Sequence, residues 1–195
     1  MVNEFVDDET FYNKVYVNDK FPNTNYYLTF RECTFNNIDF SSCDLEKIDF
    51  KDCKFQNCDF RNANFSNNGI RNLKFINCNL LGIDFSGSTL IDSIISDSNL
   101  EYSNFSLVKF NNFKFNNCSL KSASFNEVKF KKIEFNYCNL EDVEIIHTSL
   151  DKIKLNTCNI KNIKVSLKDL RGVIVDMRGA LDLSLLLGIK ISESD

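Results

Sequence analysis

An apolar residue stands at every fifth position from Phe30 to Val175, and each of these residues is Phe, Leu, Ile or Val. A second register lies two residues earlier, from Leu28 to Val173, and holds mainly small or β-branched residues. Asn68 and Lys168 fit this second register poorly. The other three positions carry nearly all of the Asn, Asp, Glu, Lys and Arg residues. The pattern therefore predicts two inward and three outward residues in each group of five.

A period of five matches neither an α-helix nor a β-strand, so each group must contain a turn. A chain that turns every five residues coils into a solenoid with stacked sides. Residues of one kind recur at multiples of twenty, which predicts four groups per coil; two such columns are Cys58, Cys78, Cys118, Cys138 and Cys158, and Phe35, Phe55, Phe75, Phe115 and Phe135. At a strand spacing of roughly 4.8 Å, we expect a closed all-β rod about 36 Å long.

Both ends of a solenoid need a cap, because each exposes an unpaired edge and an open lumen. Phe11, Tyr16, Phe21 and Tyr26 also recur every five residues, one position out of the main register. This segment is either an atypical first coil or a folded-back hairpin, and we expect it to cap the rod. The chain is thus divided into an N-terminal cap or first coil (1–27), a repeat region (28–177) and a C-terminal cap (178–195).

The C-terminal cap is predicted to be a short helix followed by a strand. Residues Ala180 to Leu187 lack β-branched residues, Gly188 suits the position after a helix, and a strand is expected over Ile189 to Ile191. The apolar residues surround too much of this helix for one lumen to bury. We expect the same end of a second chain to cover them in a homodimer, through Leu181, Leu183, Leu185, Leu186, Leu187 and Ile189.

Composition narrows the functional classes. The net charge of −4 disfavours direct binding to nucleic acid. The acidic start MVNEFVDDE does not resemble a signal peptide, and no apolar run reaches membrane-spanning length, so we expect a cytoplasmic protein without membrane contact.

Candidate chemistry is sparse. All eight cysteines occupy the small inward register without a CxxC pair, so we expect free, buried thiols that neither bind metal nor form disulfides. His147 faces outward without a second ligand, and Ser88, Ser93, Ser98 and Ser103 face inward without a nearby base. We therefore expect a binding protein and not an enzyme, with no catalytic, cofactor or metal site.

The outward charges differ from side to side. We number the sides by their first central residue: side 1 from Phe30, side 2 from Phe35, side 3 from Phe40 and side 4 from Leu45. Side 1 is net basic and includes Lys129, Lys131 and Lys132. Sides 3 and 4 are net acidic, which is typical either of a surface for a basic partner or of a solvated face. Their acidic residues are Asp39, Asp59, Glu101, Glu141 and Asp142 on side 3, and Asp44, Glu46, Asp84, Glu127 and Glu144 on side 4.

Segments such as CTFNN, IDFSS, CDLEK and CDFRN resemble the A(D/N)LXX pentapeptide repeat, over about three-quarters of the chain. This resemblance implies a right-handed quadrilateral β-helix. The stretch DLRGVIVDMRGALDLSLLLGIKI also resembles the C-terminus of the Qnr quinolone-resistance proteins, at Asp169 to Val173 and Leu187 to Ile189. It implies a dimer, joined through the C-terminal ends, that mimics B-form DNA, binds DNA gyrase and topoisomerase IV, and protects them from fluoroquinolones. Two rods of about 36 Å would match roughly 20 base pairs.

One departure from that family concerns loops. Many Qnr proteins have loops that interrupt the coils and contribute to protection, whereas this array stays in phase from 30 to 175. The segment SNNGIRN, with Asn68 and Gly69, is the best candidate for an irregular corner. The alternative function is a pentapeptide-repeat scaffold that binds another protein through its Asn-rich and acidic sides, without a topoisomerase role.

Overall fold

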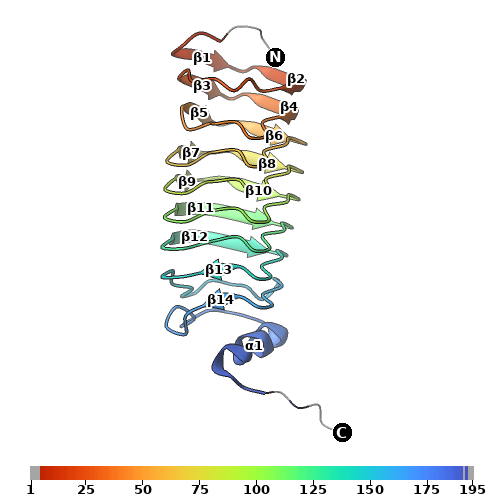
Figure 1. Cartoon of the computed structure of the whole chain (residues 1–195), viewed down its shortest axis with the longest axis vertical. Helices are drawn as coiled ribbons and strands as arrows, with labels where there is room; N and C mark the ends of the chain where they lie inside the picture. The colour runs from red at the N-terminus through yellow and green to blue at the C-terminus, as the bar shows by residue number, and fades with distance from the viewer. Residues whose placement is uncertain (1–4, 191, 193–195) are drawn as a thin grey trace.

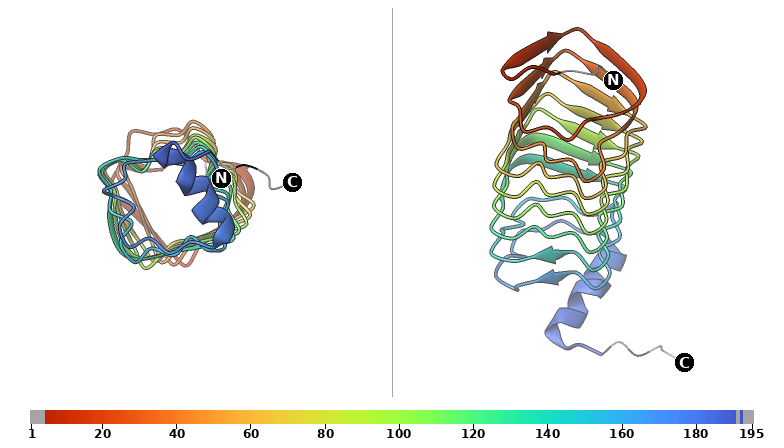
Figure 2. Two further views of the ribbon diagram at one scale, coloured as in Figure 1. Left: turned by 90° about the horizontal axis from the view of Figure 1, so that it is seen from below. Right: turned by 45° about the horizontal axis from the view of Figure 1, so that its top comes forward.

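A computed structural model describes residues 5–190 and 192 of the chain. The chain winds as a parallel β-solenoid whose coils stack from the N-terminal to the C-terminal end (Figure 1). Viewed along the axis, the coils form a four-sided outline, and one short helix lies at the C-terminal end (Figure 2). The fold class that the repeat predicts is confirmed.

Sides 1 and 2 carry the regular strands, which form one 12-stranded parallel sheet. Sides 3 and 4 are joined coil to coil mainly by isolated parallel bridges, such as Asp39 with Asp59 and Asp44 with Asn64. A separate two-stranded sheet joins β13 to β14 on side 4. The strands are β1 (Glu9–Tyr12), β2 (Val15–Lys20), β3 (Leu28–Arg31), β4 (Thr34–Asp39), β5 (Ile48–Lys51), β6 (Lys54–Gln56), β7 (Gly69–Arg71), β8 (Lys74–Ile76), β9 (Thr89–Ile91), β10 (Ile94–Ser96), β11 (Lys109–Asn116), β12 (Lys129–Asn136), β13 (Glu144–Ile145) and β14 (Lys164–Val165).

The corners explain the five-residue period. The residue two places after each central apolar residue adopts a positive φ at nearly every corner, as at Asn57 (55°), Asn62 (55°) and Asn67 (57°). This left-handed conformation turns the chain, and Asn, Asp and Gly tolerate it best. These residue types hold most of the corners. Each corner redirects the backbone so that the next two inward residues again reach the lumen.

Stacked aromatic rings fill the lumen. Rings one coil apart lie nearly parallel, with centroids 4.5 Å apart for Phe40 and Phe60 and 4.7 Å apart for Phe105 and Phe125. Rings on neighbouring sides meet edge to face, as Phe55 and Phe60 do at 5.2 Å. Both arrangements suit the charge distribution of the ring, and each such pair adds about 0.5–1.5 kcal/mol beyond area burial.

The N-terminal segment forms a coil that is one residue short. Strand β1 pairs in parallel with β3 so that Phe11 lies opposite Phe30, 19 residues later, which accounts for the register offset seen in the sequence. Phe5 is buried, and its ring contacts those of Phe11 and Phe21 at 5.4 and 5.7 Å. Phe5 therefore closes the lumen at this end. Residues 1–4 of the predicted cap lie outside the described residues.

The C-terminal end carries α1 (Met177–Ser184), which continues as one turn of 3-10 helix, η1 (Leu185–Leu187). Gly188 ends it with a φ of 72°, in agreement with the sequence. The predicted strand over Ile189 to Ile191 is wrong at residues 189 and 190, which have no regular structure, because the described backbone offers no partner strand beyond the last coil. Ile191 lies outside the described residues. Within the described part of the chain, no helix is long and apolar enough to cross a membrane.

Candidate partner-binding surfaces

The carboxylates of side 3 are largely neutralised by neighbouring cations. Asp59 pairs with Arg61 at 2.6 Å, and Lys121 lies 3.3 Å from Glu141 and 3.9 Å from Asp142. At the N-terminal end, Lys20 lies 3.6 Å from Asp39, and hydrogen bonds from Ser41 help to lower the pKa of Asp39. Glu101 accepts a hydrogen bond of 2.9 Å from Ser119. Side 3 therefore presents weaker negative charge than its sequence predicts.

The carboxylates of side 4 form no ion pair with any described residue. Four of them accept hydrogen bonds from uncharged groups. The side-chain amide of Asn64 donates to Asp44 (3.1 Å), that of Asn67 to Glu46 (3.1 Å) and that of Asn126 to Glu144 (3.4 Å). The backbone N–H of Ser86 donates to Asp84 (2.8 Å). Glu127 is exposed at a corner. None of the five predicted acids of side 4 is thus paired with a cation among the described residues.

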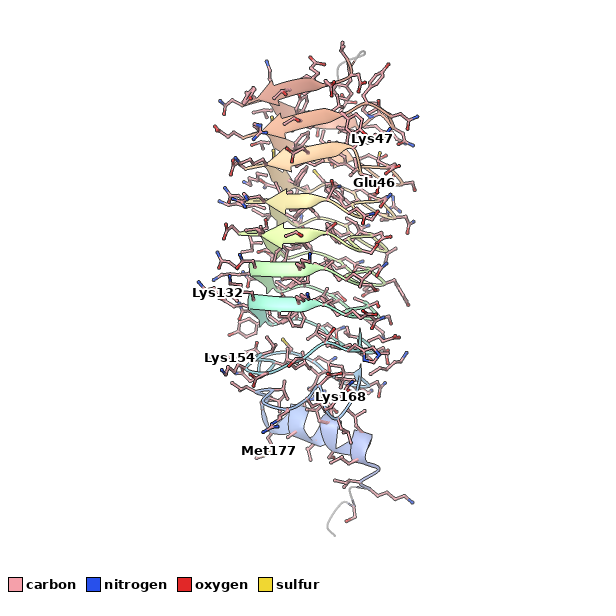
Figure 3. The ribbon with its side chains drawn as sticks, turned by 90° about the vertical axis from the view of Figure 1, so that its left-hand side faces the viewer. Glu46, Lys47, Lys132, Lys154, Lys168 and Met177 are labelled. Carbon is pink, nitrogen blue, oxygen red and sulfur yellow. The ribbon has the colours of Figure 1, made fainter. Side chains whose placement is uncertain are left out.

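Side 1 presents the opposite sign. Lys129, Lys131 and Lys132 are exposed on consecutive outward positions of strand β12. Figure 3 looks onto this side: Lys132 and Lys154 project from one edge, and Glu46 and Lys47 from the other. Side 1 therefore separates the basic edge of the rod from its acidic side 4.

The predicted dimer residues lie together at the C-terminal end. Leu181, Leu185, Leu186, Leu187 and Ile189 are exposed, whereas Leu183 is half-buried against the core. A shallow groove runs beside them between helix α1 and the last coil, lined by Asn162 to Val165, Asp182, Leu185 and Leu186. The helix lies across one part of the end of the rod (Figure 2).

The interior polar groups serve the backbone. The thiol of Cys58 donates to the carbonyl oxygen of Phe35, and the hydroxyl of Ser98 donates to the backbone carbonyl oxygen of Ser96 at 2.7 Å. Seven of the eight free thiols are buried, and Cys158 is partly exposed. Burial raises the pKa of Cys43 to about 11 and that of Cys53 to about 12, so these thiols stay protonated. Among the described residues, no group of His, Cys, Asp or Glu side chains could hold a metal ion.

Sequence reasoning missed two features of the outer surface. It summed the charges of each side and did not separate the paired acids of side 3 from the unpaired ones of side 4. It also missed the bulky residues at left-handed corners, including Tyr102 and Leu107. The sequence contained the signal for these residues. Most other corner positions hold Asn, Asp or Gly, so Tyr and Leu at corner positions stand out as exceptions.

A model of the pentapeptide repeat region matches residues 28–105, 48–125 and 108–176. These overlapping matches cover well over half of the sequence, so the chain belongs to the pentapeptide-repeat family. Among curated proteins, none matches this sequence.

Several solved structures share the solenoid. One is a trypsin-treated variant of QnrB1, a plasmid-mediated fluoroquinolone resistance protein, with 22% identity, a TM-score of 0.42, and 94% of this chain and 100% of that chain covered. Another is HetL, involved in heterocyst differentiation regulation in the cyanobacterium Nostoc sp., with 13% identity, a TM-score of 0.44 and 87% of each chain covered. A pentapeptide repeat protein from the Arabidopsis thaliana thylakoid lumen is 22% identical, with a TM-score of 0.25 and 55% and 67% covered. These likenesses concern the fold alone.

Proposed function

We propose that this protein is a non-enzymatic DNA mimic of the cytoplasm that binds DNA gyrase or topoisomerase IV and protects it from fluoroquinolones. The observation that carries the proposal is the set of carboxylates along side 4, from Asp44 to Glu144, that form no ion pair with any described residue. The resemblance of the segment from Asp169 to Ile189 to the C-terminus of Qnr proteins supports it.

Unpaired carboxylates suit a DNA-binding partner for an electrostatic reason. The phosphate-binding Lys and Arg residues of such a partner need anions that are free to accept charge-assisted hydrogen bonds. An acid already held by a cation would first have to break that pair, as Asp59 would have to leave Arg61. The acids of side 4 are free of this cost, so side 4 is the better candidate contact than side 3.

Supercoiling and quinolone-induced cleavage assays test the function. Adding the protein should restore supercoiling by gyrase, or decatenation by topoisomerase IV, in the presence of a fluoroquinolone. The double change Glu46→Lys and Glu127→Lys on side 4 should abolish this rescue. The matched control, Asp92→Lys with Asp97→Lys, reverses two acids at the corners that bound side 2 and should leave it intact.

Absence of rescue and of binding to either enzyme would contradict the proposal. Equal loss of rescue in both double variants would place the contact elsewhere than side 4. A protein that binds neither enzyme but captures another cytoplasmic protein would favour the alternative, a pentapeptide-repeat scaffold.

The proposed dimer requires the exposed leucines of the C-terminal end. Burying them between two chains would remove apolar surface from water at about 25 cal/mol per Å². Changing Leu185 and Leu187 to Asp should convert a dimer into a monomer by light scattering. Val15→Asp, at an exposed apolar position of the opposite end, is the control and should remain dimeric. A monomeric unmodified protein would contradict the dimer.

A further inference from the structure

Three corners of the rod carry a Tyr or Leu side chain in a backbone conformation that disfavours it. Tyr102, Leu107 and Tyr137 have φ values of 59°, 63° and 55°. They are also among the most exposed large side chains, at 63%, 55% and 73%. The left-handed conformation costs a residue other than Gly, Asn or Asp roughly 1–2 kcal/mol. These residues therefore neither ease the turn nor contribute to the core.

One coil earlier, glycine occupies the two corresponding corners. Gly82 stands in the corner column of Tyr102, and Gly87 in that of Leu107, each with a positive φ. The solenoid thus accepts a residue suited to the turn at both corners. Backbone strain that packing does not offset is typical of functional positions.

Two of the three corners bound side 4. Tyr102 and Leu107 lie on successive corners of one coil, and side 4 runs between them through Asn104 and Ser106. Farther toward the C-terminus, Ile146 and Leu167 are also exposed on this side. Tyr137 lies at the corner between sides 2 and 3, away from side 4.

Two of the acids of side 4 lie one coil away from this apolar pair. Glu127 follows Leu107 by one coil in the same corner column, and Asp84 precedes Asn104 by one coil. A surface that combines exposed Tyr and Leu with unpaired carboxylates complements a protein segment that carries both basic and apolar residues. Tyr is one of the residue types enriched among the few residues that dominate the binding energy of protein interfaces.

We propose that Tyr102 and Leu107 anchor the protein partner on side 4, where apolar contact adds to charge. This inference rests on the proposed function and identifies the partner as a basic segment of the topoisomerase with apolar residues among its Lys and Arg. A surface that imitated phosphates alone would use charge only, so its binding would disappear at high salt. The anchored contact retains part of its affinity there.

Binding of gyrase and topoisomerase IV to the full chain, measured by calorimetry at low and high salt, tests this inference. The variant Tyr102→Asn with Leu107→Asn should have a raised Tm, because Asn tolerates the left-handed turn. Its affinity for the enzyme that binds the unmodified protein should fall tenfold or more. Tyr137→Asn relieves the same backbone strain away from side 4, so it should raise the Tm and leave the affinity unchanged.

Three binding results would contradict the role of Tyr102 and Leu107. An unmodified protein that binds neither enzyme overturns both the proposed function and this inference. Binding of the unmodified protein together with equal affinity in the double variant overturns only the inference. Equal losses of affinity in the double variant and in Tyr137→Asn also overturn it, because the effect would not belong to side 4.

Discussion

Four serines line the lumen through one coil, and three of them complete the backbone hydrogen bonding of the preceding coil. The hydroxyls of Ser88, Ser93 and Ser98 each accept a backbone N–H at 2.9–3.0 Å and donate to a carbonyl oxygen. Ser103 differs because the N–H of Ile83, one coil earlier, donates to Leu80 within a turn. The hydroxyl of Ser103 is buried without a partner in the described structure.

These two environments predict opposite mutational effects at the residue scale. Ser93→Ala leaves the buried N–H of Leu73 without its acceptor, so the free energy of unfolding should fall by about 1–3 kcal/mol. Ser103→Ala removes an unpaired hydroxyl from a column that already holds Ala63 and Ala123, so stability should stay equal or rise by up to about 1 kcal/mol. Urea denaturation of the two variants measures both, and equal destabilisation would contradict the assignment.

Helix α1 depends on two local features at the scale of the element. The carboxylate of Asp176 accepts the N–H of Gly179 at 2.8 Å and caps the first turn. Gly179 lets the helix approach the last coil, because an added Cβ would lie 3.0 Å from Val175 and 3.1 Å from Ile160. The cap and the close approach together hold the helix against the end of the rod.

Removal of the cap should loosen this helix selectively. Asp176→Ala should destabilise α1 by about 1 kcal/mol, whereas Asp176→Asn retains a capping oxygen and should have little effect. Hydrogen exchange at the amide of Ala180, which donates to the carbonyl oxygen of Asp176, should accelerate in the Ala variant. Exchange in β11 should not change, because each coil contacts its neighbours only. Faster exchange throughout the rod would contradict a local role.

The buried thiol of Cys53 sets an alkaline limit on the stability of the rod. Burial raises the pKa of Cys53 from 9.0 to about 12, so the folded protein binds more protons than the unfolded chain between these values. Stability from this thiol is therefore complete below about pH 9 and is lost as the pH rises toward 12. Cys53→Ser should reduce this alkaline slope of the unfolding free energy, as urea titrations from pH 8 to 11 would measure. An unchanged slope would contradict a buried, protonated Cys53.

The sequence predicts the interior better than the exterior, for a physical reason. The lumen allows only two inward residues per turn, so the register from Phe30 follows from periodicity alone. Even Asn68 keeps its place in the inward register, because its side-chain amide donates to the carbonyl oxygen of Leu45 at 3.0 Å. Lys168 is exposed instead, near the end of the array. Outside, an ion pair such as Lys121 with Glu141 depends on side-chain reach between coils, which no periodic rule fixes.

The exact repetition of the coils also bears on how a partner finds its place. A surface that recurs with every coil offers nearly equivalent positions, each displaced by one strand spacing of about 4.8 Å. Charge alone would allow a bound partner to slip along side 4 among them. Tyr102 does not recur in its column, and Leu107 recurs only three coils later as Leu167. The pair of Tyr102 and Leu107 therefore occurs on one coil alone and breaks this translational degeneracy. The partner would therefore bind at one defined coil of the rod.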